Sequence, residues 1–237
     1  MITSDGSTTI HLPDWNEQYH SKHGAIQEAY HVFIKAGLEK VLGSSTKSNQ
    51  NTILRKNKIT QTNNISILEI GFGTGLNAFI TFLETEKVAT KIDYVGVEAY
   101  PISEEEVEKL NYISILKAEK HQEVLKKMHS LSWEEKHKIS ENFSLTKKKQ
   151  FFEKIKENNA FDLIYFDAFG AKNQPELWTE LIFSKMFTAL KENGILVTYS
   201  AKGSVRRAME SVGFVVERLQ GPLGKREMLR AVKKDVQ

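Results

Sequence analysis

The 237-residue sequence contains no cysteine and few prolines, and none of its apolar runs approaches the roughly 20 residues that span a bilayer. The absence of cysteine excludes thiol catalysis, disulfide bonds, cysteine-type zinc sites and iron–sulfur clusters. With 14 glycines and four prolines, the chain is neither collagen-like nor of low complexity. Residues Met1 to Pro13 are polar and lack the basic-then-apolar order of a signal peptide. We therefore expect a cytoplasmic protein without a membrane segment.

The overall charge is also small. The 33 Lys and Arg residues exceed the 30 acids by three, too mild a surplus to indicate a nucleic-acid partner by itself. The surplus is concentrated toward the C-terminus, where residues 198–237 hold nine Lys and Arg residues against four acids. Hydrophobic residues make up 40% of the chain and charged residues 27%, as in a soluble folded protein.

Residues 1–64 differ in character from the rest of the chain. Apolar residues recur at helical spacing from Gly24 to Leu42, which predicts a partly buried helix. A polar stretch of loop-like composition then continues to Asn64. We expect an N-terminal helical segment over residues 1–64 and a larger domain over residues 65–237.

Short apolar runs alternate with helical patterns in this larger domain, which predicts right-handed βαβ units and an open, doubly wound α/β sheet. Near-continuous apolar runs of this length are typical of parallel strands buried on both faces. The expected strands are Ile65–Ile70, Ile92–Glu98, Phe143–Leu145, Phe161–Asp167, Gly194–Ser200, Phe214–Leu219 and Met228–Val232. The expected helices between them are Thr74–Glu86, Ser103–Leu110, Glu176–Lys191 and Ser204–Val212.

The two last strands are joined by a short turn and should form an antiparallel hairpin. A terminal hairpin on a mostly parallel, Rossmann-like sheet of seven strands is the arrangement of class I S-adenosylmethionine methyltransferases. The Lys- and Glu-rich stretch Asn111–Asn142 predicts a helical insertion made of two amphipathic helices.

A glycine-rich turn follows the first strand and opens a helix. It reads Glu69-Ile-Gly-Phe-Gly-Thr-Gly75, so its glycines follow the pattern G-x-G-x-G with an acid two residues ahead of Gly71. Glycines let the backbone turn tightly and lie against a ligand, and helix-start N–H groups can receive a carboxylate. The pattern indicates S-adenosylmethionine more than a dinucleotide, although NAD binding and a generic turn stay as alternatives.

Two further residues are candidates for contacts with the nucleoside part of such a ligand. Glu98 closes the second strand, where an acid can bind the ribose hydroxyls. Gln150 follows the third strand, where its amide oxygen could accept a hydrogen bond from the adenine amino group. A solvated helix start is the alternative for Gln150.

Asp167 leaves the fourth strand at the place where amino-methylating enzymes put their reactive motif. An alkylamine with a pKa near ~10 is mostly protonated at neutral pH and cannot attack a methyl group until it loses a proton. A carboxylate in hydrogen-bonding reach can accept that proton and orient the nitrogen. Phe169 could line the same pocket and favour a cation through its ring. The alternative is that Asp167 merely caps the following turn.

Four blocks carry a resemblance to a known family. They are Glu-Ile-Gly-Phe-Gly-Thr-Gly-Leu-Asn77, Asp-Ala-Phe-Gly-Ala-Lys-Asn-Gln-Pro-Glu-Leu-Trp178, Tyr-Ser-Ala-Lys-Gly-Ser-Val-Arg-Arg207 and Gly-Lys-Arg-Glu-Met-Leu-Arg230. From about Tyr19 to Val232 the chain resembles the methyltransferase domain of the tRNA 5-methylaminomethyl-2-thiouridine biosynthesis family, MnmC and its stand-alone relative MnmD. It departs from that family in its longer insertion and in lacking the usual Gly-Asp after the third strand.

The resemblance implies methylation of the 5-aminomethyl group of the wobble (2-thio)uridine in tRNA, with S-adenosylmethionine as methyl donor. It implies that Asp167 is the catalytic acid beside the amine. The candidate cofactor-binding residues are Glu69, Gly71, Gly73, Gly75, Asn77, Glu98, Gln150 and Phe169. Neither a flavin nor a metal is expected, because the chain ends at Gln237 without a flavin oxidase domain and its seven histidines show no zinc-like arrangement.

Six basic residues fall in loops or helix starts that follow the later strands and are candidates for contact with the tRNA anticodon region. They are Lys172, Lys202, Arg206, Arg207, Lys225 and Arg226. Singly, each could instead be a solvated surface charge. Two other functions stay open from the residues alone: methylation of a small-molecule or protein amine, and an inactive methyltransferase fold that serves as a binding module.

Overall fold

The computed structural model describes residues 1–13, 17–43, 64–88 and 90–234. An eight-stranded sheet forms the centre, in the order β5-β6-β4-β3-β7-β8-β10-β9. The five strands from β6 to β8 run parallel, whereas β5 and β10 are antiparallel to their neighbours. The strands are β3 (Asn64–Ile70), β4 (Lys91–Glu98), β5 (Lys136–Lys138), β6 (Phe143–Lys149), β7 (Phe161–Phe166), β8 (Leu190–Thr198), β9 (Phe214–Gln220) and β10 (Glu227–Lys233).

All seven predicted strands of the sheet are present, and the terminal antiparallel pair is confirmed. The predicted number of strands was too low by one, because β5 pairs with β6 at the sheet edge. This edge strand has the sequence Lys-His-Lys and lies inside the stretch expected to be a helical insertion. Its polar side chains give no apolar run, so the sequence pattern could not reveal it.

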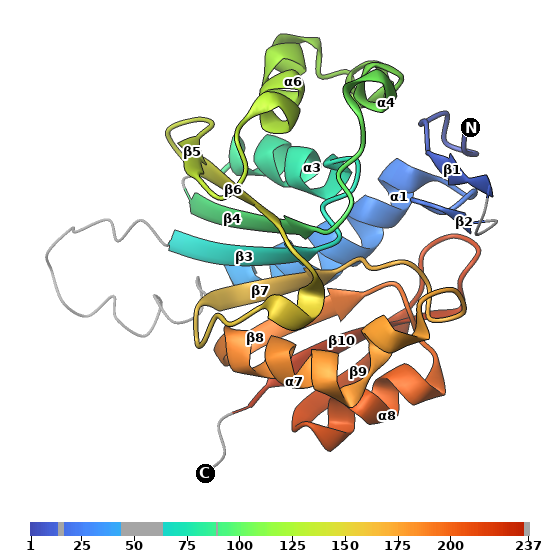
Figure 1. The fold of residues 1–237 in the computed structure, drawn as a ribbon, viewed down its shortest axis with the longest axis vertical. Helices are drawn as coiled ribbons and strands as arrows, with labels where there is room; N and C mark the ends of the chain where they lie inside the picture. The colour runs from blue at the N-terminus through green and yellow to red at the C-terminus, as the bar shows by residue number, and fades with distance from the viewer. Residues whose placement is uncertain (14–16, 44–63, 89, 235–237) are drawn as a thin grey trace, which may run out of the picture.

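Two layers of helices cover the sheet (Figure 1). One layer contains α1 (Ala25–Ala29), the π-helix η2 (Tyr30–Leu38), α3 (Leu76–Thr85), α5 (Tyr112–Ile115) and α6 (Gln122–Ser130). The other contains α7 (Glu180–Ala189), α8 (Gly203–Ser211) and the 3₁₀ turns η4 (Phe152–Lys154) and η5 (Pro175–Trp178). Two shorter helices, α4 (Glu104–Glu108) and η3 (Glu119–His121), complete the insertion beside α6.

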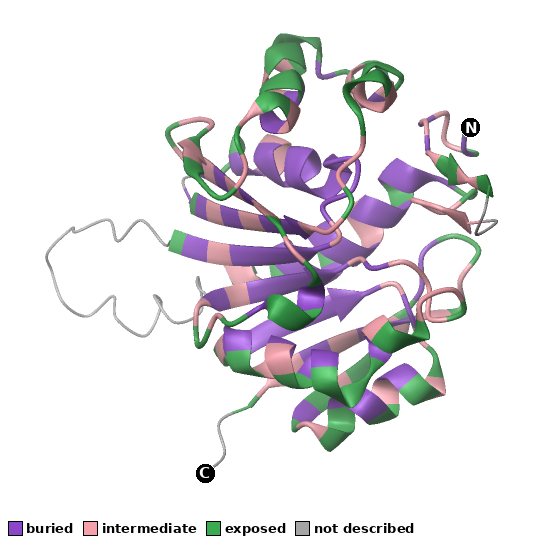
Figure 2. Cartoon of the chain, viewed as in Figure 1, coloured by how far each residue is buried: buried purple, intermediate pink, exposed green. Residues whose placement is uncertain are grey.

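Alternation along β3 shows how one strand supplies both hydrophobic cores. Ile65 and Ile67 face the layer with α3 and η2, whereas Leu68 and Ile70 face the layer with α7 and α8. All four are buried, and most of β3 has the colour of buried residues in Figure 2. Burying such a side chain stabilises the fold by about 1.5–3 kcal/mol, so the strand is fixed in register from both sides.

The predicted N-terminal helix is confirmed, but nine of its residues are wound as a π-helix. Val32 and Phe33 belong to the same core as Ile67 of the sheet, so this segment packs directly on the domain that follows it. Short strands β1 (His11–Leu12) and β2 (Glu17–Gln18) pair in front of it, near the ends toward which the arrows of β3 and β4 point (Figure 1). Most of the predicted polar stretch, residues 44–63, lies outside the described residues.

The insertion differs from the two amphipathic helices that its composition predicts. Its first part is broken into the short helices α5 and η3, and only α6 is a helix of several turns. The chain then turns at Glu134, which has a positive φ, and runs back as β5. Leu125 and Met128 of α6 are buried against the sheet, which fixes the insertion beside the glycine-rich turn.

Candidate active site

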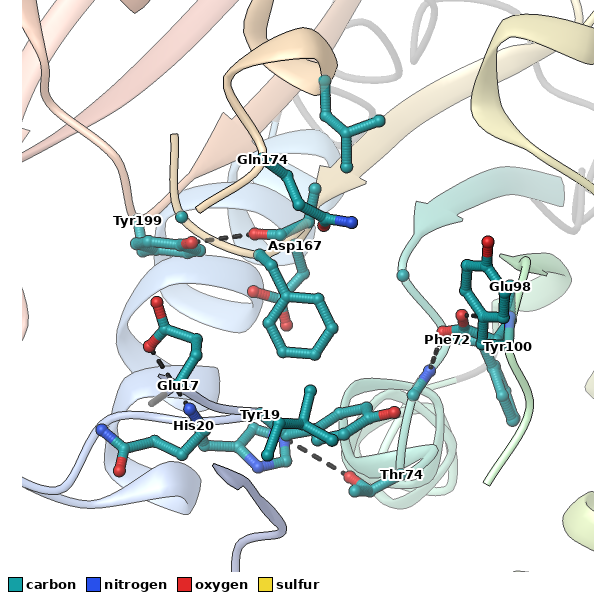
Figure 3. Close-up of a pocket in the computed structure, with 18 of the residues that line it drawn as sticks. Glu17, Tyr19, His20, Phe72, Thr74, Glu98, Tyr100, Asp167, Gln174 and Tyr199 are labelled. Carbon is teal, nitrogen blue, oxygen red and sulfur yellow. Dashed lines mark hydrogen bonds between the residues drawn. The ribbon is translucent and has the colours of Figure 1, made fainter. Parts of the chain in front are cut away.

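A cavity of about 930 Å³ lies at the carboxyl edge of the parallel strands. This is the edge at which open α/β sheets bind their ligands, and the volume lies in the range of small-molecule sites. Its wall is built by the turn after β3, the ends of β4 and β7, the loop after β8, the β9–β10 connection and the N-terminal segment. Figure 3 shows Asp167, Tyr19 and Glu98 facing this space from three different elements.

The predicted glycine-rich turn crosses the floor of the cavity. Gly71 has φ +87°, and a Cβ there would lie 2.7 Å from the backbone oxygen of Asp167. Gly73 has φ +48°, and a Cβ there would lie 3.0 Å from the ring of Tyr19. Side chains at these positions would therefore be strained and would fill space beside the cavity. Both glycines line the cavity, whereas Gly75 caps α3 behind the turn and does not line it.

Glu98 ends β4 with its carboxylate on the cavity wall. One oxygen accepts a hydrogen bond from the backbone N–H of Gly73 at 3.0 Å and the other from that of Tyr100 at 2.9 Å. Burial raises its pKa, and these backbone hydrogen bonds oppose the rise. The carboxylate thus joins the glycine-rich turn to the end of β4, where a ribose contact was predicted.

Asn77 connects two carboxyl groups beneath the cavity. Its Nδ2 donates to Oε1 of Glu69 and to Oδ2 of Asp167, both at 2.9 Å. Its Oδ1 is buried without a hydrogen-bond partner among the described residues. Asn77 lines the cavity, but Glu69 is fully buried behind it and does not. The structure therefore places Glu69 as a support for Asn77 rather than on the cavity wall.

Asp167 follows β7 and lines the cavity with a half-buried side chain. Burial, helped by the negative charge of Glu28, raises its pKa to about 7, while Asn77 and Lys225 oppose the rise. A carboxyl group with a pKa near 7 is suited to accept and release protons at neutral pH. Asp167 thus lies on the cavity wall, where it can reach a bound substrate, and its role as the catalytic acid stays a prediction.

The N-terminal segment forms a wall of the cavity that the sequence patterns did not reveal. Tyr19 lies over Gly73, and its ring makes an edge contact with Phe169 at 5.0 Å between centroids. His20 lies 3.4 Å from the hydroxyl of Thr74 in the glycine-rich turn (Figure 3). Residues before the first strand carried no motif, so only their long-range contacts identify them as part of the site.

Thr74 of the glycine-rich turn contacts two residues of the insertion. Its hydroxyl accepts a hydrogen bond from Tyr112 at 2.9 Å, and its carbonyl lies 3.0 Å from Nε2 of His129. Burial lowers the pKa of both His20 and His129 to about 4, so both rings are neutral at pH 7. A carbonyl can only accept, which makes Nε2 of His129 the donor. The N-terminal segment and the insertion thus both contact the glycine-rich turn at Thr74.

Phe169 lines the cavity as predicted, and its backbone is held by the neighbouring helix layer. Its carbonyl accepts a hydrogen bond from Nε1 of Trp178 at 2.8 Å. Trp178 itself is buried and contacts Phe166 and Phe183, so it belongs to the core and is not available to stack on a base.

The structure does not place Gln150 on the cavity wall. The next residues, Phe151, Phe152 and Glu153, line it instead, and the ring of Phe151 contacts the exposed ring of Tyr100 at 5.9 Å between centroids. β6 runs on to Lys149 and the chain reaches the cavity only after Gln150, so the adenine contact of Gln150 stays a prediction. Glu153 is thus a second carboxylate at this end that the sequence reasoning missed.

The six basic residues predicted to contact tRNA occupy different environments. Lys172, Lys202, Arg207 and Arg226 are exposed, and Arg206 pairs with Glu210 on α8 at 3.2 Å. Lys225 differs from the others, because it lines the cavity and its ammonium contacts the carboxylate of Glu28. In the described part of the chain no group of three or more His, Cys, Asp or Glu residues is placed to hold a metal ion, and no helix is long and apolar enough to cross a membrane.

The residues on this wall fit a nucleoside that carries a charged amino-acid end. The glycines with positive φ leave room for close approach, Oδ1 of Asn77 has no donor among the described residues, and Glu98 offers carboxylate oxygens. Strand order and site together define a class I S-adenosylmethionine-dependent methyltransferase fold. A family model described as S-adenosyl-L-methionine-dependent methyltransferase matches residues 116–234, just over half of the chain, and the chain belongs to this family.

Individual relatives give more detail. The crystal structure of MNMC2 from Aquifex aeolicus superposes with a TM-score of 0.74 at 26% identity, covering 100% of this chain and 70% of that chain. The bifunctional protein MnmC of Marinomonas sp., named for tRNA 5-methylaminomethyl-2-thiouridine biosynthesis, is 25% identical over 92% of this chain. An uncharacterized protein of Methanocaldococcus jannaschii is 27% identical over 98% of this chain and 58% of its own length. The chain spans only about a third of the MnmC relatives, 31% in the Marinomonas protein.

Proposed function

We propose that this protein methylates the 5-aminomethyl group of wobble (2-thio)uridine in tRNA and so forms 5-methylaminomethyl(-2-thio)uridine. The observation that carries the proposal is Asp167, a carboxylate with a pKa near 7 on the wall of the cavity built around the glycine-rich turn. The names of the MnmC relatives and of the Aquifex structure support the choice of tRNA.

Each residue of the site has one role in the proposed reaction. Gly71, Gly73 and Asn77 would hold the methionine end of S-adenosylmethionine, and Glu98 would hold its ribose. The bound sulfonium compound provides the methyl group. Asp167 accepts a proton from the substrate ammonium and orients the freed lone pair, and Asn77 holds the receiving oxygen in place. The transferred methyl group leaves a neutral thioether and a methylated ammonium as products.

The tRNA itself would lie across the mouth of the cavity with its anticodon region. The exposed basic residues Lys172, Lys202 and Arg226 lie in the loops that follow β7, β8 and β9, and exposed Arg207 lies in the middle of α8. We infer that they contact phosphates, which position the RNA without reading its sequence. Each contact should steepen the salt dependence of binding by about 0.7–0.9 log unit per log unit of salt.

Nucleoside mass spectrometry tests the proposal directly. A tRNA whose wobble uridine carries a 5-aminomethyl group that is not yet methylated is incubated with the protein and S-adenosylmethionine, and is then digested to nucleosides. The 5-methylaminomethyl nucleoside should appear, and tRNA with an unsubstituted uridine is the control. Methyl transfer only to small amines or proteins would replace the proposed substrate, and failure to bind S-adenosylmethionine in calorimetry would leave a non-catalytic binding module.

The reaction rate should fall as the pH is lowered through about 7. Asp167 is protonated below its pKa of about 7 and then cannot accept a proton from the amine. Between pH 8 and pH 5.5 we expect the single-turnover rate to fall about 30-fold, with a slope of one log unit per pH unit at the acid end. Reactions with saturating tRNA that are quenched at set times measure the single-turnover rate at each pH. A rate that stays flat across this range would contradict the role given to Asp167.

A further inference from the structure

Lys225 occupies an unusual position for a residue of a surface turn. It lies in the connection between β9 and β10, yet its ammonium reaches the cavity wall and pairs with Oε1 of Glu28 on α1. The same ammonium lies 3.8 Å from the centroid of the Tyr199 ring. An ammonium over an aromatic face is attracted by the ring quadrupole. Two independent contacts therefore fix this one charge.

Both partners of Lys225 are themselves held in place. The second carboxylate oxygen of Glu28 accepts a hydrogen bond from the backbone N–H of Ser21 at 3.2 Å. The hydroxyl of Tyr199 donates to the carbonyl of Ala168, the residue after Asp167, at 2.8 Å. The ring that carries the ammonium is thus bonded to the backbone of the catalytic loop. Lys225, Tyr199, Glu28 and Asp167 all line one cavity.

We propose that Lys225 is a positioning residue whose fixed ammonium favours the ionised form of the Asp167 carboxylate, the form that can accept the substrate proton. This role replaces the phosphate contact predicted for Lys225, and its use in catalysis rests on the proposed function. Glu28 and Tyr199 hold the ammonium at the cavity wall, although the side chain of Lys225 is itself 32% exposed.

The charges around Asp167 support this assignment, because they shift its pKa in opposite directions. The negative charge of Glu28 and burial raise the pKa of Asp167, whereas the positive charge of Lys225 and the amide of Asn77 lower it. The titratable and charged groups that interact with Asp167 come from several elements: Glu28 of α1, Glu69 of β3, Tyr94 of β4, Tyr199 after β8 and Lys225. Lys225 carries the positive charge among these groups. Replacing it with a neutral residue therefore removes the charge that lowers the pKa of Asp167.

A titration of the free protein tests the proposal without substrate or cofactor. The side-chain carboxyl signals of ¹³C-labelled aspartates are followed by NMR, and Asp167→Asn identifies the signal of Asp167. Lys225→Met should raise the pKa of Asp167 by at least about one unit, and Lys225→Arg should restore it. Glu28→Gln should move it in the opposite direction. An unchanged pKa in Lys225→Met and in the alternative variant Lys225→Gln would overturn the proposal.

Kinetics provide a second readout. Lys225→Met should lose methyl transfer at pH 7 and regain it at higher pH, with the KM for tRNA unchanged. A raised KM at every pH, with a salt dependence lowered by about one unit, would instead show a phosphate contact and overturn the proposal. Lys233→Met is the matched control, because Lys233 also lies over a ring, that of Phe187 at 5.0 Å, but does not line the cavity. If wild type transfers no methyl group to tRNA, the proposed function fails, while the NMR titration still decides the role of Lys225.

Discussion

Asp167→Asn should lower the rate of methyl transfer by about 100- to 10,000-fold and leave the binding of S-adenosylmethionine largely intact. Asparagine has the same shape and can still present an oxygen to Nδ2 of Asn77, so the loop after β7 should keep its conformation. It cannot take a proton from an ammonium group, and the amine therefore stays without a free lone pair. Single-turnover rates and isothermal calorimetry measure the two quantities separately.

Asp162 provides a matched control on the same strand. It lies at the start of β7, where its carboxylate accepts hydrogen bonds from Lys191 and from the backbone of Ser66, both at 2.8 Å. Asp162→Asn removes a carboxylate that does not line the cavity and should keep the methyl-transfer rate. Equal losses of rate and cofactor affinity in Asp167→Asn would show that Asp167 holds the structure or the cofactor rather than the proton.

Gly71→Ala should lower both stability and activity. The added Cβ would lie 2.7 Å from the backbone oxygen of Asp167, and the backbone at Gly71 has φ +87°. The left-handed conformation and the overlap together should destabilise the fold by about 2–4 kcal/mol. Because the overlap falls on Asp167 itself, the carboxylate should shift, and a displacement of this kind can lower the rate by about 100-fold. Urea unfolding and single-turnover rates measure the two effects.

Gly43→Ala serves as the comparison for this substitution. A Cβ at Gly43 meets no atom of the described residues within 4 Å, so the free energy of unfolding of Gly43→Ala should stay within about 0.5 kcal/mol of wild type. If Gly71→Ala proved as stable and as active as Gly43→Ala, the close contact between the glycine-rich turn and the loop after β7 would not exist in solution.

Most of the sheet could be predicted from the sequence, because strands buried on both faces leave continuous apolar runs between glycines and turns. The predicted Ile65–Ile70 and Phe161–Asp167 agree with β3 and β7 to within one residue. β5 could not be predicted, because an edge strand needs no buried face and its Lys-His-Lys sequence carries no pattern. The helix over Gly24–Leu42 was predicted, but helical spacing alone does not distinguish an α-helix from the π-helical winding of η2.

The residues of the candidate site also fall into those that the sequence could predict and those that it could not. Asp167, Glu98 and the glycine-rich turn could be predicted to meet, because the carboxyl ends of parallel strands share one edge of the sheet. Tyr19, His20 and Glu28 could not, since their approach depends on contacts with residues far away in the chain. Lys225 and Arg226 are adjacent basic residues in the same turn, yet one faces the cavity and the other the solvent. No local pattern distinguishes them.

The pairing of Glu28 with Lys225 spans 197 residues, and that of His31 with the carbonyl of Gln220 spans 189. Contacts this distant along the chain form late, because the entropy of closing so long a loop must first be overcome. Until the β9–β10 hairpin has been synthesised, the chain lacks Lys225 and therefore the counter-charge of Glu28. The cavity wall that Glu28 and Lys225 share is therefore completed only once the β9–β10 hairpin has docked against α1, whichever strands have assembled before it.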